Sequence, residues 1–429
     1  MRYWNIETFT SQEVRKMILE ICKRAKAASV ELAKLSAETK NKALCGMAEA
    51  VEANMAQIVS ANKKDLDVAK AKGMKTALLE RLELDRRKIE TMSRCLREVS
   101  WLPDPVGEVM RTWTRPNGLI IAQVRVPLGV VGIIYESRPD VTSDAAGICL
   151  KSGNAVILRG GSDAINSNKV IGEILRDALK DTGVPLDTVQ VLSSTERSAV
   201  EEFMKMRHYV DVLIPRGGAD LIRTVIEKTK IPVIETGTGN CHIYVEEDAD
   251  FDKAIPIIVN AKVQRPGACN AAEKLLIHSN IASKFLPRAV EALREEGVEV
   301  RGDERTLELV PDAIQATKDD WETEYLDLVI AVKVVKDLDE AIAHINKYSS
   351  KHSDSILTSS FERAQRFIKE VDSAAVYWNA STRFTDGNQF GLGAEIGIST
   401  QKLHARGPMS VQHLTSTKYV VVGNWHIRK

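Results

Sequence analysis

The stretch Val130-Val131-Gly132-Ile133-Ile134-Tyr135 decides the fold, because a strict alternation of strands and helices starts from it. The stretch is apolar and rich in β-branched residues, which predicts a buried strand, and a helix-like segment over 143–151 follows it. The later predicted strands are 156–158, 189–192, 210–214 and 232–234, and the later predicted helices are 168–181, 196–206 and 219–228. Repeated strand–helix units predict an α/β protein with a parallel, doubly wound sheet and ligand-binding loops at the carboxyl ends of its strands.

A second set of strands and helices follows Cys269 and predicts a second α/β domain. Its predicted strands are 274–277, 298–300, 328–335 and a segment near 374–378, and its predicted helices are 281–295 and 338–347. The first hundred residues or so show apolar positions at spacings of three and four, which is typical of helices with one buried face. The segment between Glu235 and Cys269 is therefore expected at the junction of two domains.

A β-hairpin is predicted between these helices and the first strand, with strands over 109–113 and 119–126 and Asn117-Gly118 in its turn. The segment 418–422 is β-prone and is expected to pair with this hairpin, either in the same chain or in a neighbouring subunit. The predicted division is a cofactor-binding domain over 1–105 and 126–235, a catalytic domain over 236–405, and an oligomerisation arm over 106–125 and 406–429.

Composition excludes several classes of function. The 429 residues contain 59 Lys plus Arg and 59 Asp plus Glu, and this balance argues against a nucleic-acid partner. The six cysteines and eight histidines show no metal-ligand spacing, so no metal site is predicted. A chain this poor in cysteine, with no signal-peptide core at its start and no apolar run of membrane-spanning length, is expected to be cytoplasmic, with no membrane partner.

Cys269 is the strongest candidate for a reactive residue. It lies in Gln264-Arg265-Pro266-Gly267-Ala268-Cys269-Asn270, where the small neighbours Gly267 and Ala268 let a flat carbonyl carbon approach the thiol. A thiolate is the side-chain nucleophile least handicapped at neutral pH, although a single cysteine is commonly only a small buried apolar residue. Upstream, the turn Ile234-Glu235-Thr236-Gly237-Thr238-Gly239-Asn240 offers Glu235 as a base, or as a residue that shapes the turn. Its glycines are expected to clear space for a flat ring or a substrate.

Two glycine-rich turns follow predicted strands and suit phosphate groups. Arg159-Gly160-Gly161-Ser162 combines a guanidinium with backbone N–H groups, and Gly217-Gly218 opens the helix over 219–228. Two such turns in one sheet favour a dinucleotide over a pair of ordinary solvated turns. Arg138, in Glu136-Ser137-Arg138-Pro139-Asp140, is expected either to clamp a carboxylate or phosphate or to pair with a neighbouring acid.

Taken together, these motifs resemble the aldehyde dehydrogenase superfamily over most of the chain. The resemblance rests on the following stretches: Pro127-Leu128-Gly129-Val130-Val131-Gly132, Tyr135-Glu136-Ser137-Arg138-Pro139-Asp140, Leu158-Arg159-Gly160-Gly161, Ile214-Pro215-Arg216-Gly217-Gly218, Gln264-Arg265-Pro266 with Cys269-Asn270, and His404-Ala405-Arg406-Gly407-Pro408. It implies a Rossmann-type cofactor domain, an α/β catalytic domain with a nucleophilic cysteine, and a small β arm that forms a homo-oligomer.

The resemblance is greatest to the branch of this superfamily that reduces an acyl phosphate. It implies NADPH-dependent reduction of L-glutamyl 5-phosphate to L-glutamate 5-semialdehyde and phosphate in proline biosynthesis, through a cysteine thioester. It also implies a functional coupling to the glutamate kinase that makes this unstable substrate. A hydrolytic NAD(P)-dependent aldehyde dehydrogenase and a non-catalytic nucleotide-binding oligomer on the same scaffold remain as alternatives.

The resemblance also assigns catalytic and cofactor roles to single residues. Cys269 becomes the nucleophile, with its backbone N–H as an oxyanion donor, and Glu235 takes the place of the base of hydrolytic members. Arg159 and Ser162 favour NADP(H) over NAD(H), because Ser162 stands where NAD-specific relatives often carry an acid that repels the 2′-phosphate. Glu324 takes the place of the acid that holds the nicotinamide ribose.

The substrate-binding residues that the resemblance implies are Ser137, Arg138, Asn240, Asn270 and Arg406. Ser137 stands where the superfamily has an asparagine oxyanion donor, which leaves the second donor open. Arg138 and Arg406 are expected to bind the substrate's α-carboxylate and its phosphate, in an order that the sequence does not decide.

Overall fold

The computed structural model describes residues 11–74, 76–194 and 196–428, and these residues form two compact units. The first unit runs up to Glu235 and also contains Gly391–Gly397 and the residues from Met409 onward. The second unit contains Thr236–Phe390 and Ile398–Pro408. Neither unit is therefore a single continuous stretch of the chain.

The first unit contains a parallel sheet in the order β5-β4-β3-β6. Its strands are β3 (Val130–Tyr135), β4 (Ala155–Gly160), β5 (Val189–Val191) and β6 (Val212–Arg216). Every residue of β3 is buried, which explains its continuous apolar run, since a strand covered on both faces has no polar side. Val233 continues the sheet beyond β6 through a single parallel bridge to Leu213, so the predicted strand at 232–234 is reduced to this bridge.

Nine described α-helices accompany this sheet in the first unit. They are α1 (Ser11–Leu32), α2 (Ala37–Ala53), α3 (Met55–Ala71), α4 (Thr76–Leu82), α5 (Arg86–Trp101), α6 (Val141–Lys151), α7 (Ile165–Asp177), α8 (Arg197–Phe203) and α9 (Ala219–Lys228). Side-chain caps fix several starts: Ser36 accepts from the Thr39 N–H at α2, and Asp85 accepts from the Lys88 N–H at α5. Apolar side chains of α1 and α8 form one core with β3 and β4.

A second parallel sheet, in the order β10-β9-β11-β8-β7-β12-β13, forms the centre of the second unit. Its strands are β7 (Cys241–Val245), β8 (Ala272–His278), β9 (Glu299–Gly302), β10 (Ile314–Gln315), β11 (Val329–Val335), β12 (Ser353–Leu357) and β13 (Ala375–Trp378). The accompanying helices are α10 (Phe251–Val263), α11 (Ser279–Glu295), α12 (Glu304–Leu309), α13 (Leu338–Tyr348) and α14 (Phe361–Glu370). Helices α10 and α11 share one apolar core with the sheet, and α13 and α14 share another. These two sheets confirm the predicted α/β fold class.

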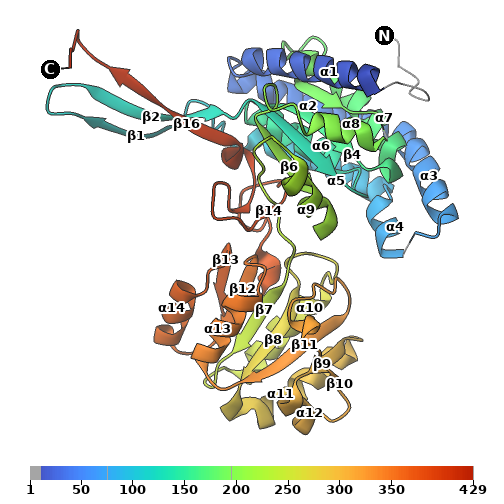
Figure 1. The fold of residues 1–429 in the computed structure, drawn as a ribbon, viewed down its shortest axis with the longest axis vertical. Helices are drawn as coiled ribbons and strands as arrows, with labels where there is room; N and C mark the ends of the chain where they lie inside the picture. Colours follow the sequence, from blue (N-terminus) through green and yellow to red (C-terminus); the bar gives the residue numbers. More distant parts are fainter. Residues whose placement is uncertain (1–10, 75, 195, 429) are drawn as a thin grey trace. The chain divides into compact units, whose positions relative to one another are not determined.

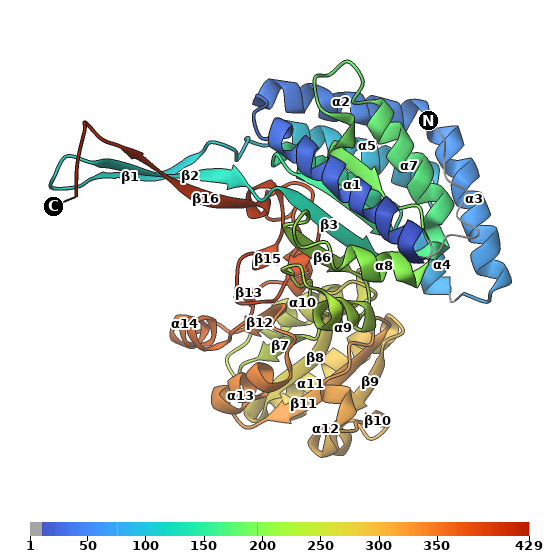
Figure 2. The same cartoon turned by 45° about the horizontal axis from the view of Figure 1, so that its top comes forward.

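A three-stranded antiparallel ribbon belongs to the first unit. Strand β2 (Ile120–Pro127) pairs with β1 (Val109–Thr114) on one side and with β16 (Thr415–Val422) on the other. Gly118 in the turn between β1 and β2 has a φ of +92°, which explains the Asn-Gly sequence there. The hairpin is confirmed, and the predicted C-terminal strand pairs with it in the same chain. Figures 1 and 2 both show the ribbon extending away from the helices of its unit.

Strands β14 (Ile398–Ser399) and β15 (Gly407–Pro408) form a short antiparallel pair in the second unit, and Thr236 bridges to Ser399 beside it.

None of the described helices combines the length and the apolar composition that a membrane crossing requires.

Candidate active site

Cys269 lies in the turn that joins the end of α10 to the start of β8, and it is half-buried. The turn is closed by the Ala268 N–H, which donates to the Arg265 carbonyl, and by the Ala271 N–H, which donates to the Ala268 carbonyl. The nucleophile predicted from the sequence therefore stands at the amino end of a buried central strand.

Four other thiols of the chain have a pKa above the usual range. Burial raises the pKa of Cys22 to about 12, and burial with nearby carboxylates raises the pKa of Cys95 to about 12. Cys149 and Cys241 are fully buried, and burial raises the pKa of each thiol above its usual range. Since the thiolate is the reactive form, these four positions favour structural roles.

Gly239 packs directly against the backbone of Cys269. A Cβ atom added to Gly239 would lie 1.6 Å from the Cys269 carbonyl oxygen and 2.3 Å from its carbonyl carbon. The thiol of Cys241 donates to the same carbonyl oxygen at 3.2 Å. The glycine therefore makes room for the backbone of Cys269, whereas the sequence suggested that it makes room for a ligand.

Two residues predicted to bind ligands hold this turn in place. The carboxylate of Glu324 accepts the Gly239 N–H at 2.7 Å, and the amide of Asn240 donates to the carbonyls of Trp321 and Tyr348, each at 2.8 Å. A similar role falls to Asn270, whose amide donates to the Thr385 carbonyl at 2.8 Å. The Oδ1 atoms of Asn240 and Asn270 are buried and have no hydrogen-bond partner among the described residues, and the role of these two residues in binding a substrate stays a prediction.

An aromatic cluster lies beneath the same turn. His344 packs edge-on against Trp321 with ring centroids 5.5 Å apart, and it also contacts Tyr348 and His242. Burial, followed by the charges of His242, Lys333, Lys274 and Lys347, lowers the pKa of His344 from 6.5 to about 2. The imidazole is therefore neutral in the folded protein throughout the ordinary pH range.

This cluster makes stability depend on pH below 6.5. In the unfolded chain His344 takes up a proton at its ordinary pKa, whereas in the folded protein it does not, so stability falls as the pH drops below 6.5. The loss is about 1.4 kcal/mol per pH unit, or about 2 kcal/mol between pH 6.5 and pH 5. We expect the difference in unfolding free energy between wild type and His344→Phe, measured by urea titration, to shift by this amount between pH 7 and pH 5. His208→Gln at an exposed position is the control, and equal pH slopes for wild type and His344→Phe would contradict the assignment.

Arg406 is engaged within the second unit. Its guanidinium donates to the Asp372 carboxylate at 3.0 Å and to the Asp372 carbonyl at 3.1 Å. Lys402 also pairs with this carboxylate, at 2.7 Å, and hydrogen bonds from Lys402 and Arg406 lower the pKa of Asp372 to about 2. Arg406 thus has an internal partner at one end of its guanidinium, while its buried Nε has no hydrogen-bond partner among the described residues, and its role in binding a substrate anion stays a prediction.

The sequence analysis assigned no role to two arginines near Cys269, which are Arg265 and Arg383. Arg383 donates from Nε to Gln264 Oε1 at 2.9 Å, so its guanidinium lies over the turn that carries the thiol. Arg265 and the Cys269 thiolate are among the charges that act on it. Arg265 stands in the quoted Gln264-Arg265-Pro266 motif, but Arg383 follows Cys269 by more than a hundred residues in a segment without a recognisable motif.

In the first unit, two arginines stand at the carboxyl ends of the two strands that flank β3. Arg159 lies in β4 and Arg216 in β6, on either side of β3. The Nε atoms of both are buried and have no hydrogen-bond partner among the described residues. Burial lowers the pKa of Arg159, with Asp163 and Glu136 acting in the opposite direction. Unpaired guanidinium donors at this edge of a parallel sheet fit an anionic group of a nucleotide.

The glycines of the two predicted phosphate turns contact side chains of their own unit. A Cβ added to Gly160 would lie 1.9 Å from Asn168 Nδ2, and one added to Gly217 would lie 2.4 Å from Glu136 Oε2. The same Glu136 carboxylate accepts the Gly218 N–H at 3.1 Å, at the start of α9. Internal packing thus explains these two glycines, and a carboxylate already occupies the N–H of Gly218.

The remaining predicted residues lie at the ends of the first unit's elements. Ser137 follows β3 with a φ of +45°, an uncommon conformation for a residue other than glycine, and its hydroxyl donates to the Asp163 carboxylate. Ser162 begins a 3₁₀ turn after Gly161, and Arg138 lies half-buried before α6. Glu235 is the last residue of the first unit before the chain enters the second.

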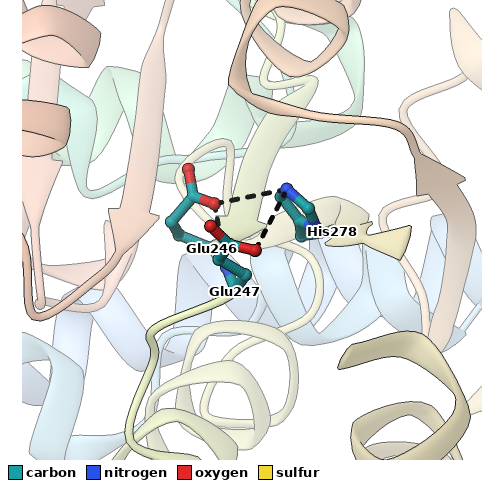
Figure 3. A group of neighbouring side chains, drawn as sticks. All are labelled: Glu246, Glu247 and His278. Carbon is teal, nitrogen blue, oxygen red and sulfur yellow. Dashed lines mark hydrogen bonds and ion pairs between the residues drawn. The ribbon is translucent and has the colours of Figure 1, made fainter. Parts of the chain in front are cut away.

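A separate group of Glu246, Glu247 and His278 lies at the carboxyl edge of the second unit's sheet (Figure 3). Its ligand atoms come close enough to hold a cation, with His278 Nε2 3.6 Å from Glu246 and 4.0 Å from Glu247. However, His278 Nδ1 accepts the Asn280 N–H, which leaves the imidazole proton on Nε2. Glu247 is also bound by Arg363 and Asn280. These contacts favour a network of ion pairs and hydrogen bonds over a metal centre.

Comparisons with known proteins agree with this architecture. The sequence pattern described as the aldehyde dehydrogenase family matches residues 5–311 and 309–420. The gamma-glutamyl phosphate reductase of Thermoanaerobacter sp. (strain X514) is 58% identical over 407 residues, which cover 95% of this chain and 98% of that protein. The enzyme of the same name from Carboxydothermus hydrogenoformans is 58% identical over 411 residues, with 96% and 99% covered.

Solved structures give the same result. The crystal structure of gamma-glutamyl phosphate reductase from Thermotoga maritima matches with a TM-score of 0.94 and 54% identity, covering 96% of this chain and 100% of that one. An acetylating aldehyde dehydrogenase from Geobacillus thermoglucosidasius, at 18% identity and a TM-score of 0.71, shares the fold. The chain therefore belongs to the aldehyde dehydrogenase family and, within it, to the gamma-glutamyl phosphate reductases.

Proposed function

We propose that this protein reduces L-glutamyl 5-phosphate to L-glutamate 5-semialdehyde and phosphate, with NADPH as the reductant, in proline biosynthesis. The observation that carries the proposal is Cys269, a half-exposed thiol in a turn braced by Gly239 and Cys241, in a chain 58% identical to proteins named gamma-glutamyl phosphate reductase.

Cys269 acts as the nucleophile in this proposal. Its thiolate attacks the acyl carbon, a C–S bond forms, and the bond from that carbon to the phosphate oxygen breaks with its electron pair leaving on the phosphate. The backbone N–H of Cys269 is the proposed donor to the oxyanion that develops during the attack. The turn is held from below by Gly239, Cys241 and Glu324, so the thiol is oriented before the substrate binds.

The first unit is proposed to bind NADPH at the carboxyl ends of β3, β4 and β6. Arg159 and Arg216, with their unpartnered Nε atoms, are the proposed donors to its phosphates. Ser162 replaces the acid that would repel a 2′-phosphate, which supports NADP(H) over NAD(H). NADPH supplies, when bound, the hydride that reduces the thioester. Glu324 is proposed to bind the nicotinamide ribose as well as the Gly239 N–H.

The second candidate function is that of a hydrolytic aldehyde dehydrogenase. Glu235 favours it, because hydrolytic members of the family have a base at this position that activates water. Reduction of an acyl phosphate requires no such water. The two candidate functions therefore differ in whether the reaction requires phosphate. The presence of Glu235 does not distinguish them.

The reverse reaction tests the proposed function. Purified protein is incubated with glutamate semialdehyde, with NADP⁺ or NAD⁺, and with or without inorganic phosphate, and the formation of reduced cofactor is followed at 340 nm. We expect reduction that depends on phosphate and that is faster with NADP⁺ than with NAD⁺. Reduction at the same rate without phosphate or arsenate would contradict the proposal and support the hydrolytic candidate.

We further propose that the protein forms a homo-oligomer through the ribbon of β1, β2 and β16. Large apolar side chains are exposed on this ribbon, which is typical of a surface that a partner covers. They include Val109, Met110, Ile120, Tyr419, Val421 and Val422, which are between 43% and 59% exposed. The lability of an acyl phosphate supports a functional coupling to the glutamate kinase that supplies it.

A further inference from the structure

We propose that Arg265 and Arg383 form the site that binds the phosphoryl group of the substrate, the group that leaves when Cys269 attacks. This inference rests on the proposed function, since it names the part of the substrate that two otherwise unassigned guanidinium groups recognise.

The first step is the position of Arg383. The segment 382–385 docks on the residue that follows the nucleophile: the Thr382 hydroxyl donates to the Asn270 carbonyl at 2.7 Å, and the Asn270 amide donates to the Thr385 carbonyl at 2.8 Å and the Arg383 carbonyl at 3.4 Å. The Arg383 side chain then reaches back to Gln264 at 2.9 Å. Arg383 is thus fixed at both ends of the 264–270 turn, through its backbone at one end and its guanidinium at the other.

The second step is the absence of an internal counter-charge. Within residues 11–74, 76–194 and 196–428, no carboxylate lies within 4.0 Å of the guanidinium of Arg265 or Arg383, although most arginines of the second unit are paired with acids. The pKa of Arg383 is lowered by burial and then by the charge of Arg265, while the Cys269 thiolate and Asp386 act in the opposite direction. The charge of Arg265 therefore acts unfavourably on Arg383, neither guanidinium forms an ion pair with an acid, and a bound anion would relieve this repulsion.

The third step is the chemistry of the leaving group. When the thiolate attacks, the electron pair of the broken carbon–oxygen bond moves to the phosphate, which gains negative charge and then takes a proton from water. The phosphate oxygen is bonded to the carbon under attack, so it lies close to the thiol at that moment, whereas the α-carboxylate is several bonds further along the substrate. Guanidinium groups match phosphate oxygens in geometry and charge, and they stabilise charge that develops as the bond breaks. Arg406, one of the two arginines that the sequence predicted for the substrate anions, already donates to Asp372.

The test measures the phosphate dependence of the reverse reaction. In Arg383→Gln and Arg265→Gln we expect the KM for inorganic phosphate to rise about tenfold or more, because a hydrogen bond to a charged group is lost, while the KM for glutamate semialdehyde changes less than twofold. Arg383→Lys keeps the charge and is expected to fall between wild type and Arg383→Gln. Arg294→Gln, at an exposed pair with Asp312 on α11, is the matched control and should leave both constants unchanged.

A second measurement needs no turnover. Inorganic phosphate is expected to protect Cys269 of the wild type against alkylation by iodoacetamide, read by peptide mass spectrometry, and to give no protection in Arg383→Gln. A KM for phosphate within twofold of wild type in both glutamine variants overturns the inference, as does a rise in the KM for glutamate semialdehyde alone, which would assign the pair to the α-carboxylate. If the wild type shows no phosphate-dependent turnover, the proposed function fails, while protection of Cys269 by phosphate still decides whether the pair binds this anion.

Discussion

Replacement of Cys269 by serine is expected to lower kcat by about 10⁴-fold or more, because the acyl group then has no thiolate to which it can be transferred. A serine hydroxyl is almost entirely protonated at neutral pH and is a far weaker nucleophile than a thiolate. The change of one sulfur to one oxygen in a half-exposed turn should leave the thermal unfolding temperature close to that of the wild type.

The measurement is single-turnover and steady-state reduction with NADPH, with Cys45→Ser in α2 as the control for loss of a thiol elsewhere. Trapping of a thioester in the wild type by mass spectrometry, and its absence in Cys269→Ser, would add a direct readout. A loss of tenfold or less in Cys269→Ser would favour a non-catalytic nucleotide-binding protein on the same scaffold.

The second large effect is expected from Gly239→Ala, a change that adds one methyl group. That methyl carbon would lie 1.6 Å from the Cys269 carbonyl oxygen, and the obstacle is backbone, so it cannot rotate away as a side chain would. The turn of Cys269 or the 237–241 segment must shift by an ångström or more. A displacement of this size at a reacting group costs about 100-fold in rate, so we expect kcat to fall by about 100-fold.

Gly46→Ala is the matched control for this change. Gly46 lies in α2, and a Cβ there would meet only the Ala178 carbonyl oxygen, at an ordinary contact distance of 3.6 Å. Alanine in a helix should stabilise the fold by about 0.5–1 kcal/mol and leave turnover unchanged. Turnover of Gly239→Ala within threefold of the wild type would show that the close packing of Gly239 and Cys269 does not position the thiol.

Apolar sequence runs predicted strands β3 and β11, which are rich in valine and isoleucine, and β8 through its segment Leu275-Leu276-Ile277, whereas the polar strand β12 was missed. Strand β12 reads Ser-Asp-Ser-Ile-Leu, and its first three residues are fully buried because hydrogen bonds satisfy them. Asp354, for example, accepts from the His242 N–H and from the hydroxyls of Ser349 and Ser373. Hydrophobic periodicity carries no trace of such partners, which come from distant parts of the chain.

The same distinction applies to the site. Cys269 could be singled out as a candidate from the sequence because its residue type and its small neighbours favour a reactive thiol, and its role stays a prediction. The role of Gly239 could not be predicted, because the group that excludes a side chain there is a carbonyl thirty residues later in the sequence. Arg383 carries no motif, and only the docking of its segment on Asn270 brings it to the thiol. The contact of Arg406 with Asp372 could not be predicted either, because no motif relates the two residues.

During synthesis of the chain, the pairing of β2 with β16 is delayed, because the two strands lie far apart in the sequence. Strand β2 is complete when residue 127 has been made, whereas its partner begins at residue 415, roughly 290 residues later. At a synthesis rate of about 5–20 residues per second, the edge of β2 that pairs with β16 stays unpaired for about 15–60 s while the chain is still bound to the ribosome. An exposed strand edge is a template for association with other chains, so nascent copies on one messenger are most vulnerable to mispairing during this interval.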